Sequence, residues 1–417
     1  MLSVLVRARR LCLAALALLA LAPVLAGCGG VSSSPAAVNV GKQLTVYSGL
    51  PLQGPSAAIS RQIVGGEKLA LADAGGRIGS LTVSYVSLDD SNPVSGEWDP
   101  GVTAANAKAV AQDPTTIAYL GDYNSGATAV SLPLINAASI LQVSPASPYV
   151  GLTSSLDAGQ DEPERFYPTG KRTFARVDPG DRVQAAAQVA LLRAENVHRL
   201  YVLADQDPFD GPLAQILAAD ARQAGIQVSG EDTITIAPGA SFTGEVAKIA
   251  QSGAQAVFVS ATATSEAARL FRELHSADAR LALLAASTMK SPVFTADLGA
   301  AEAITTVGSP LLPASYYPAS AKRVLAQYRI RFSSSPEPYA LYGYEAMEVV
   351  LDAIRRAGSH GDDRQAAIDE LFATHHRHSV LGDYSIQPNG ETTLSTYAID
   401  RIARGAPVFW RSFHAPA

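Results

Sequence analysis

Cysteine is almost absent from this chain of 417 residues. Its two cysteines, Cys12 and Cys28, both lie near the amino terminus. The remainder of the chain can therefore form neither a disulfide framework nor a cysteine-based metal site. Its fold must be held by a hydrophobic core, and a chain of this length predicts two domains.

Basic clusters and long apolar runs are also scarce. The chain carries 32 Lys and Arg against 38 Asp and Glu, with no extended basic run beyond its first ten residues, which argues against a nucleic-acid partner. The single long apolar run, from Leu11 to Val24, is shorter than the ~20 residues that a membrane-spanning helix needs. We therefore expect no part of the mature chain to cross the membrane.

Signatures of catalysis are missing too. The sequence contains neither G-x-S-x-G nor H-E-x-x-H. The stretch from Gly170 to Thr173 resembles the end of a phosphate-binding loop, but Arg165 stands where that loop requires a glycine. We predict no enzyme, no cofactor and no metal site, with an enzyme of the cell envelope as the weakest alternative. We interpret three histidines as a solvated helix end without a metal: His375, His376 and His378. Three aspartates lack the rest of the EF-hand pattern and are also interpreted as metal-free: Asp205, Asp207 and Asp210.

The amino terminus has the order of an export signal. Three arginines precede the apolar run, and Leu-Ala-Gly-Cys, ending at Cys28, follows it. The last four residues resemble a bacterial lipobox, whose cysteine is lipidated. We predict a signal peptide over residues 1–27, and a lipidated Cys28 with a flexible tether over residues 28–43. The protein would then be extracytoplasmic and anchored by lipid to the bacterial cell membrane, at its periplasmic face or the cell surface.

The rest of the chain alternates between strand-like and helix-like segments. A loop over residues 154–172 separates two such series, and each predicts a parallel sheet with helices on both faces. Strands are predicted at 44–48, 81–85, 117–120, 140–143, 174–177, 200–204, 257–260 and 281–285. Helices are predicted at 56–74, 102–112, 125–138, 181–195, 211–224, 265–275, 319–332 and 339–357. Pro388-Asn389-Gly390 predicts a turn among antiparallel strands near the carboxyl terminus.

Five stretches, in this order and spacing, carry a family resemblance: Ser48 to Gly54, Leu120 to Gly126, Leu132 to Asn136, Ile140 to Pro145, and Leu152-Thr153. The chain resembles the type I periplasmic binding proteins, and within them the branched-chain amino acid (Leu/Ile/Val) receptors of ABC importers. The resemblance implies an α/β fold with two doubly wound parallel-sheet lobes joined by a three-crossing hinge. It also implies a small-molecule ligand in the cleft between the lobes, an ABC permease as partner, and a monomer.

The resemblance also divides the chain. Lobe one would comprise residues 44–176 and 308–380, and lobe two residues 177–307 and 381–417. The three crossings would lie near 176–178, 307–310 and 380–384. A sensing subunit of a membrane receptor would have the same fold, so it remains an alternative. So does a binding protein for a non-amino-acid carboxylate or amide.

Ligands of open α/β sheets bind beyond the carboxyl ends of the strands. There, Asn124 or Ser125 would cap a helix whose free N–H groups favour a carboxylate. The resemblance places further contacts on the neighbouring loops and, in lobe two, an aromatic ring at Phe209. The predicted ligand-binding residues are Gln53, Tyr123, Asn124, Ser125, Ser144, Ala146, Ser147, Phe209, Ser260 and Thr288.

Two departures from the family pattern concern the ligand. Pro148 stands where amino-acid receptors have threonine, and proline offers neither N–H nor hydroxyl. Thr288 stands where they place the acid that binds the ammonium group, and no acid occurs between Asp278 and Asp297. Another acid such as Asp122 or Asp207 would have to serve, or the ligand lacks an α-ammonium. These departures predict weak binding of leucine, isoleucine and valine, and tighter binding of a small polar or carboxylate compound without that group.

The lipobox generates a first prediction. Cys28→Ser should release the protein from membranes, because acyl chains that contribute about 0.8 kcal/mol per buried methylene would no longer be attached. Fractionation of cells and mass spectrometry of the amino-terminal peptide would measure this. Full membrane retention of the variant, with no lipid on the wild-type peptide, would contradict the prediction.

Overall fold

The structure, a computed structural model, describes residues 38–207 and 209–415. The predicted signal peptide and Cys28 lie outside the described residues. Asn39 forms a β-bridge with Asp363, and the N–H of Val40 donates to the carbonyl of Asp362 at 2.7 Å. The end of the predicted tether is therefore attached to the folded part of the chain.

A six-stranded sheet contains the first strands of the chain. Its order is β2–β3–β1–β4–β5–β6, and β2 alone runs antiparallel to its neighbour. All residues of β4 are buried, as expected for a strand covered on both faces. The strands are β1 (Gln43–Leu50), β2 (Arg77–Ile78), β3 (Leu81–Asp89), β4 (Thr116–Gly121), β5 (Leu141–Ser144) and β6 (Phe174–Arg176).

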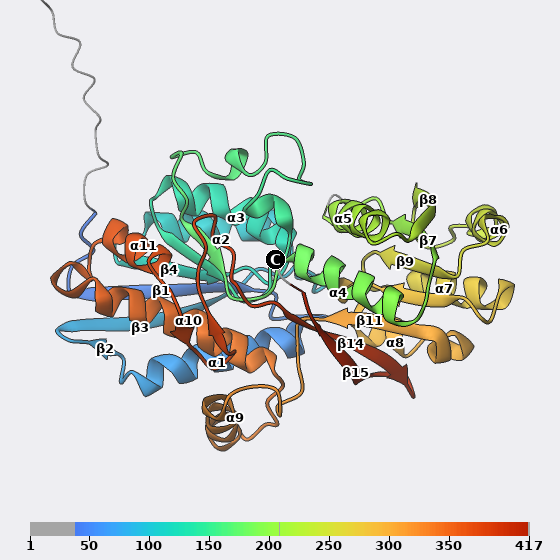
Figure 1. Ribbon diagram of the computed structural model, residues 1–417. Helices are drawn as coiled ribbons and strands as arrows, with labels where there is room; N and C mark the ends of the chain where they lie inside the picture. Colours follow the sequence, from blue (N-terminus) through green and yellow to red (C-terminus); the bar gives the residue numbers. More distant parts are fainter. Residues whose placement is uncertain (1–37, 208, 416–417) are drawn as a thin grey trace, which may run out of the picture. The chain divides into compact units, whose positions relative to one another are not determined.

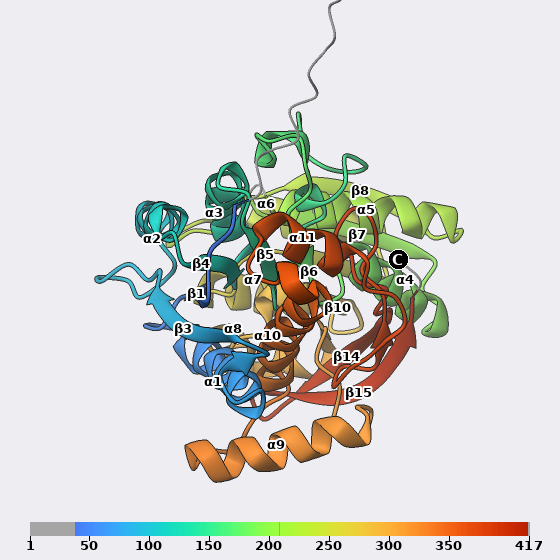
Figure 2. The same ribbon diagram turned by 90° about the vertical axis from the view of Figure 1, so that its left-hand side faces the viewer.

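Helices from two distant parts of the sequence cover this sheet. α1 (Ala57–Asp73) and α10 (Tyr339–Arg356) pack side by side, across the sheet from α2 (Pro100–Gln112) and α3 (Ser125–Ala137) (Figures 1 and 2). A Cβ atom at Gly343 of α10 would lie 2.7 Å from the carbonyl carbon of Ile63, so the close approach of the two helices requires glycine. The remaining elements packed here are α9 (Ala319–Phe332), α11 (Arg364–Phe372), β12 (Arg377–His378) and β13 (Asp383–Tyr384).

A seven-stranded sheet contains the later strands, in the order β15–β14–β11–β10–β9–β7–β8. The strands β7 to β11 run parallel, whereas β14 and β15 form an antiparallel hairpin at one edge. The bounds are β7 (Arg199–Ala204), β8 (Gln227–Thr233), β9 (Ala256–Ser260), β10 (Ala282–Ala285), β11 (Thr305–Ser309), β14 (Thr396–Ala403) and β15 (Ala406–His414).

Alternate side chains of β7 enter two different cores of this sheet. Leu200 and Val202 pack with α4 and α5, whereas Tyr201 and Leu203 pack with α6 and α7. This is the period of two that a strand buried on both faces requires. The helices are α4 (Asp181–Ala194), α5 (Asp210–Gln223), α6 (Thr243–Ser252), α7 (Ser265–Ala277) and α8 (Pro292–Thr295). Short 3₁₀ turns are η1 (Val150–Leu152), η2 (Glu164–Phe166), η3 (Ser287–Met289), η4 (Gly299–Ile304) and η5 (Gly358–His360).

The chain passes between the two sheets after β6, after β11 and before β14. The fully buried side chain of Arg176, at the end of β6, joins the first of these passages to the third. Its guanidinium donates to Glu391 Oε1 at 2.7 Å, to Thr153 Oγ1 at 2.8 Å and to the carbonyl of Tyr149 at 3.0 Å. It also donates to the carbonyl of Ser147. One side chain thus fixes the loop after β5 and the segment before β14.

The predicted fold class, two doubly wound parallel-dominated sheets, is confirmed. The sequence did not predict β8 or α6, because β8 is an exposed edge strand with a polar sequence. The turn at Pro388-Asn389-Gly390 is present, bracketed by a bridge between Ile386 and Thr392. The carboxyl-terminal hairpin, however, turns at Arg404-Gly405, where both residues have positive φ.

Glu391→Gln should lower the free energy of unfolding by about 3 kcal/mol, because it leaves a buried guanidinium without its counter-charge. Urea unfolding followed by circular dichroism would measure the loss. Asp278→Asn is the matched control, since it breaks the exposed pair with Arg280 and should change stability little. Equal losses in the two variants would contradict a structural role for the Arg176–Glu391 pair.

Candidate functional site

The loops that follow β1, β3, β4 and β5 lie at one edge of the first sheet, because these strands are parallel neighbours. The loop after β1 is tied to the end of β3. The N–H of Leu52 donates to Asp89 Oδ1 at 2.9 Å, and the side-chain amide of Gln53 donates to Asp89 Oδ2 at 2.8 Å. Gln53 is exposed, and its hydrogen bond to Asp89 holds its side-chain amide at this edge of the sheet.

Asp122, directly after β4, organises the same edge. Its carboxyl group accepts from the Tyr119 hydroxyl at 2.7 Å and the Ser131 hydroxyl at 2.5 Å. Its carbonyl accepts from Ser144 Oγ at 2.8 Å and Ser147 Oγ at 2.9 Å. Burial raises the pKa of Asp122 to about 7. The hydroxyls of the predicted ligand residues Ser144 and Ser147 are therefore engaged inside the protein. Both carboxyl oxygens of Asp122 already accept hydrogen bonds from Tyr119 and Ser131, which makes Asp122 a poor ammonium acceptor.

The amino terminus of α3 is open to a polar group. Asn124 occupies the N-cap position, but its side chain makes no capping hydrogen bond, unlike the predicted cap. Its Oδ1 atom is buried and has no partner among the described residues. Ser125 Oγ accepts from the N–H of Tyr149 at 3.3 Å, while Tyr123 and Ala146 are half-buried beside it. Within the described residues no side chain caps the first N–H groups of α3, as an anion site requires.

Aromatic rings from three parts of the chain meet at this helix terminus. The ring of Phe209 packs edge-on against Tyr149, with centroids 5.0 Å apart. A Cβ atom at Gly126 would lie 2.6 Å from the Trp98 ring and 2.9 Å from the Phe209 ring. Phe209 precedes α5, which packs on the second sheet, but its ring contacts Tyr149 in the loop after β5 of the first sheet. The sequence predicted Phe209 but not Trp98, which lies outside the stretches that carry the family resemblance.

An acid reaches Thr288 from a distant segment. Asp210, in the first turn of α5, lies with Oδ1 2.8 Å from Ser260 Oγ and 3.5 Å from Thr288 Oγ1. Burial, and then the charge of Asp205, raises the pKa of Asp210 well above its usual value. No basic side chain pairs with it among the described residues. Asp210 is therefore a candidate for the other acid that an ammonium group near Thr288 would need, in place of Asp122 or Asp207. Whether an ammonium group binds there stays a prediction, as does the argument from Pro148.

The structure thus gathers the predicted residues into two groups. Gln53, Tyr123, Asn124, Ser125 and Ala146 line the strand-end loops of the first sheet, and Ser260 and Thr288 surround Asp210 at the strand ends of the second. Phe209 lies between the groups. The arrangement offers free helix N–H groups, aromatic surface and a carboxyl group, which suits reversible binding of a small zwitterion. Which of these residues touch a ligand stays a prediction.

Two strand-end clusters on two doubly wound sheets define a solute-binding protein. The chain matches the family model described as "Periplasmic binding protein" over residues 49–406, and it belongs to that family. The predicted family resemblance is thereby confirmed. Within the described residues, no helix is long and apolar enough to span a membrane.

Three similar proteins illustrate the relationship. The Leu/Ile/Val-binding protein homolog 1 of Brucella abortus is 24% identical over 361 residues, covering 86% of this chain and 90% of that protein. The chemotactic signal transduction substrate-binding protein BasB of Halobacterium salinarum is 29% identical over 188 residues, covering 43% and 41%. The leucine-binding protein LivK of Thermotoga maritima superposes with a TM-score of 0.71 at 19% identity, covering 89% and 99%, and so shares the fold.

Asp210→Asn should stabilise the ligand-free protein near pH 8 and have a smaller effect near pH 4. Because the pKa of Asp210 is raised in the folded chain, folding keeps a proton on it, and that cost grows as pH rises above the unfolded pKa. Thermal unfolding at the two pH values would measure the difference. Asp232→Asn should act oppositely, since the Tyr201 hydrogen bond holds the pKa of Asp232 low. A destabilised Asp210→Asn protein near pH 8 would contradict the assignment.

Proposed function

We propose that this protein is the extracytoplasmic receptor of an ABC importer, held at the membrane by lipid on Cys28, that captures a small ligand of the amino acid type. The ligand would bind between lobe one (44–176 and 308–380) and lobe two (177–307 and 381–417). The observation that carries the choice of ligand is Asp210, a carboxyl group enclosed beside Ser260 and Thr288, for which the described part of the chain offers no basic partner.

The polar ends of an amino acid match the two groups of residues. Its carboxylate would accept from the first N–H groups of α3, beside Asn124 and Ser125, where the helix dipole favours negative charge. Its ammonium would bind Asp210, which would ionise as the ligand arrives, because an opposite charge nearby favours the carboxylate form. Its side chain would lie on the rings of Phe209 and Trp98. Pro148 removes one donor from the carboxylate end and is expected to lower affinity.

Closure of the lobes would accompany binding. The contact between Phe209 and Tyr149 brings the two sheets' loops together, and a ligand touching both would stabilise this closed arrangement. A ligand shifts such an equilibrium only through its higher affinity for one state. The closed form would then present the surface that the permease recognises.

A sensing role is the second candidate. It is favoured by the similarity to BasB, a substrate-binding protein of a chemotactic signal transduction system. The match covers less than half of either chain, so transport remains the first proposal. Permease and ATPase genes beside this one would favour transport, and a neighbouring kinase gene would favour sensing.

Isothermal calorimetry with leucine and its deaminated keto acid tests the proposed ligand class. Leucine should bind more tightly than the keto acid, and its affinity should rise with pH as Asp210 loses its proton. Asp210→Asn should weaken leucine binding by about tenfold or more, since a hydrogen bond to a charged group contributes about 1.5–3 kcal/mol. The keto acid should bind both proteins equally.

Asp232→Asn is the matched control, because it removes a carboxylate that is paired with Lys248 elsewhere in the second sheet. Its leucine affinity should equal that of the wild type. Tighter binding of the keto acid, with Asp210→Asn without effect, would contradict the amino acid proposal and favour a carboxylate without an ammonium group.

A further inference from the structure

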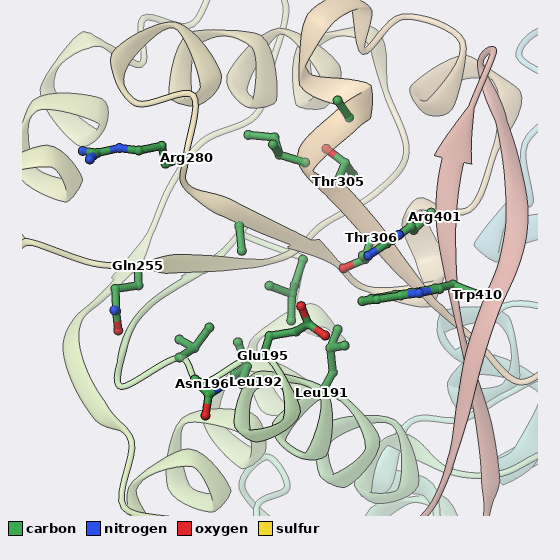
Figure 3. A pocket seen from close by; sticks show the side chains of 15 residues that line it. Leu191, Leu192, Glu195, Asn196, Gln255, Arg280, Thr305, Thr306, Arg401 and Trp410 are labelled. Carbon is green, nitrogen blue, oxygen red and sulfur yellow. The ribbon is translucent and has the colours of Figure 1, made fainter.

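A cavity of about 340 Å³ lies at the edge of the seven-stranded sheet that is opposite to the proposed ligand cleft (Figure 3). Gln255, which precedes β9, lines it together with Ala282 at the start of β10 and Thr305 at the start of β11. These are the amino ends of the parallel strands, whereas Ser260 and Thr288 lie at or beyond the carboxyl ends. The cavity is therefore separate from the proposed ligand cleft, and its volume is that of a small-molecule pocket.

The floor of this cavity is apolar apart from the side chains of Glu195 and Asn196, which also line it. Leu191 and Leu192 of α4 and Leu284 of β10 line it and are buried, and Val197 and Ile304 extend the same surface. An apolar group placed here would be removed from water, which contributes about 25 cal/mol for each Å² buried. These apolar residues favour a ligand with an apolar body, but they do not determine the charge of its polar end.

Trp410 forms one wall and is fixed by a β-bulge. Asp400 pairs with Phe409 and Ile399 pairs with Arg411, so Trp410 is the unpaired extra residue of β15. The guanidinium carbons of Arg401 and Arg411 lie 3.5 and 3.6 Å from the centre of its ring. Two guanidiniums at that distance cannot share one face, so the indole is held between them. Bulges of this kind re-aim a side chain, here toward the cavity.

The arginines around this cavity differ in whether an acidic side chain pairs with them. Arg411 pairs with Glu195 at 3.1 Å, and Arg280, at the far side of the cavity, pairs with Asp278. Arg401 has neither an acidic partner nor a side-chain hydrogen bond among the described residues. Stacking on Trp410 uses the face of its guanidinium and leaves the in-plane N–H donors free. Figure 3 shows Arg401 and Thr306 next to one another above the apolar floor.

We propose that this cavity is a second binding site, specific for a small carboxylate with an apolar body. The carboxylate would accept a bidentate pair of hydrogen bonds from Arg401, with the Thr306 hydroxyl beside it. The apolar body would lie on Leu191, Leu284 and the edge of Trp410. The site stands independently of the ligand in the cleft and of the transport role.

The two tryptophans separate the two sites experimentally. Trp98 lies at the cleft and Trp410 at the cavity, so the Trp98→Phe protein reports on the cavity alone. Titration of this mature, full-length protein with hexanoate should change its tryptophan fluorescence saturably. Hexanamide, its neutral match, should bind about tenfold or more weakly. Arg401→Gln in the same background should reduce hexanoate affinity to that of hexanamide.

Arg199→Gln is the charge-matched control, since Arg199 begins β7 at the same sheet edge but does not line the cavity; it should leave hexanoate affinity unchanged. Circular dichroism verifies the fold of each variant, and the comparison of hexanoate with hexanamide remains decisive if Arg401→Gln fails to fold. Absence of a saturable response at millimolar hexanoate overturns the proposal. So does equal affinity for acid and amide, or a response confined to Trp98 in the Trp410→Phe protein.

Discussion

A buried guanidinium, that of Arg176, holds together parts of the chain that lie more than two hundred residues apart. It meets the Glu391 carboxylate at 2.7 Å and donates to two carbonyls of the loop after β5. Because an unpaired charge in this position would cost several kcal/mol, the first and third passages between the sheets must stay together. The loop after β5 and the joint between the sheets therefore share one anchor, and a motion at one must be accommodated at the other.

Buried acids accumulate around that joint without an equal number of bases. Burial raises the pKa of Asp178 to about 7 and that of Asp181 to about 8. Burial also raises the pKa of Asp90, directly after β3, to about 8. Neither carboxyl oxygen of Asp90 has a partner among the described residues. Groups of this kind weaken a fold, and proteins retain them chiefly where they bind or react. All three follow strands of the first sheet, Asp90 after β3 and the other two after β6.

The sequence predicted the order of most strands and helices, because burial on two faces leaves continuous apolar runs and clear helical periods. It missed β8, whose exposed edge position permits the polar sequence Gln227–Thr233. It also placed no acid beside Thr288, since Asp210 approaches from 78 residues away. Local patterns indicate which residues are buried, but they do not indicate which distant side chains converge. For the same reason, the sequence of the loop after β5 did not predict that the hydroxyls of Ser144 and Ser147 donate to the Asp122 carbonyl.

The close contact between α1 and α10 at Gly343 affects the order in which the first core can form during synthesis. α1 is made early, but the helix that covers it begins at Tyr339, after the whole parallel part of the second sheet. The first sheet therefore cannot complete its core while the chain is still emerging, and its contacts are of long sequence separation, which slows folding. Because the segments of the first core are discontinuous in the sequence, that core is completed only after α10 has been made.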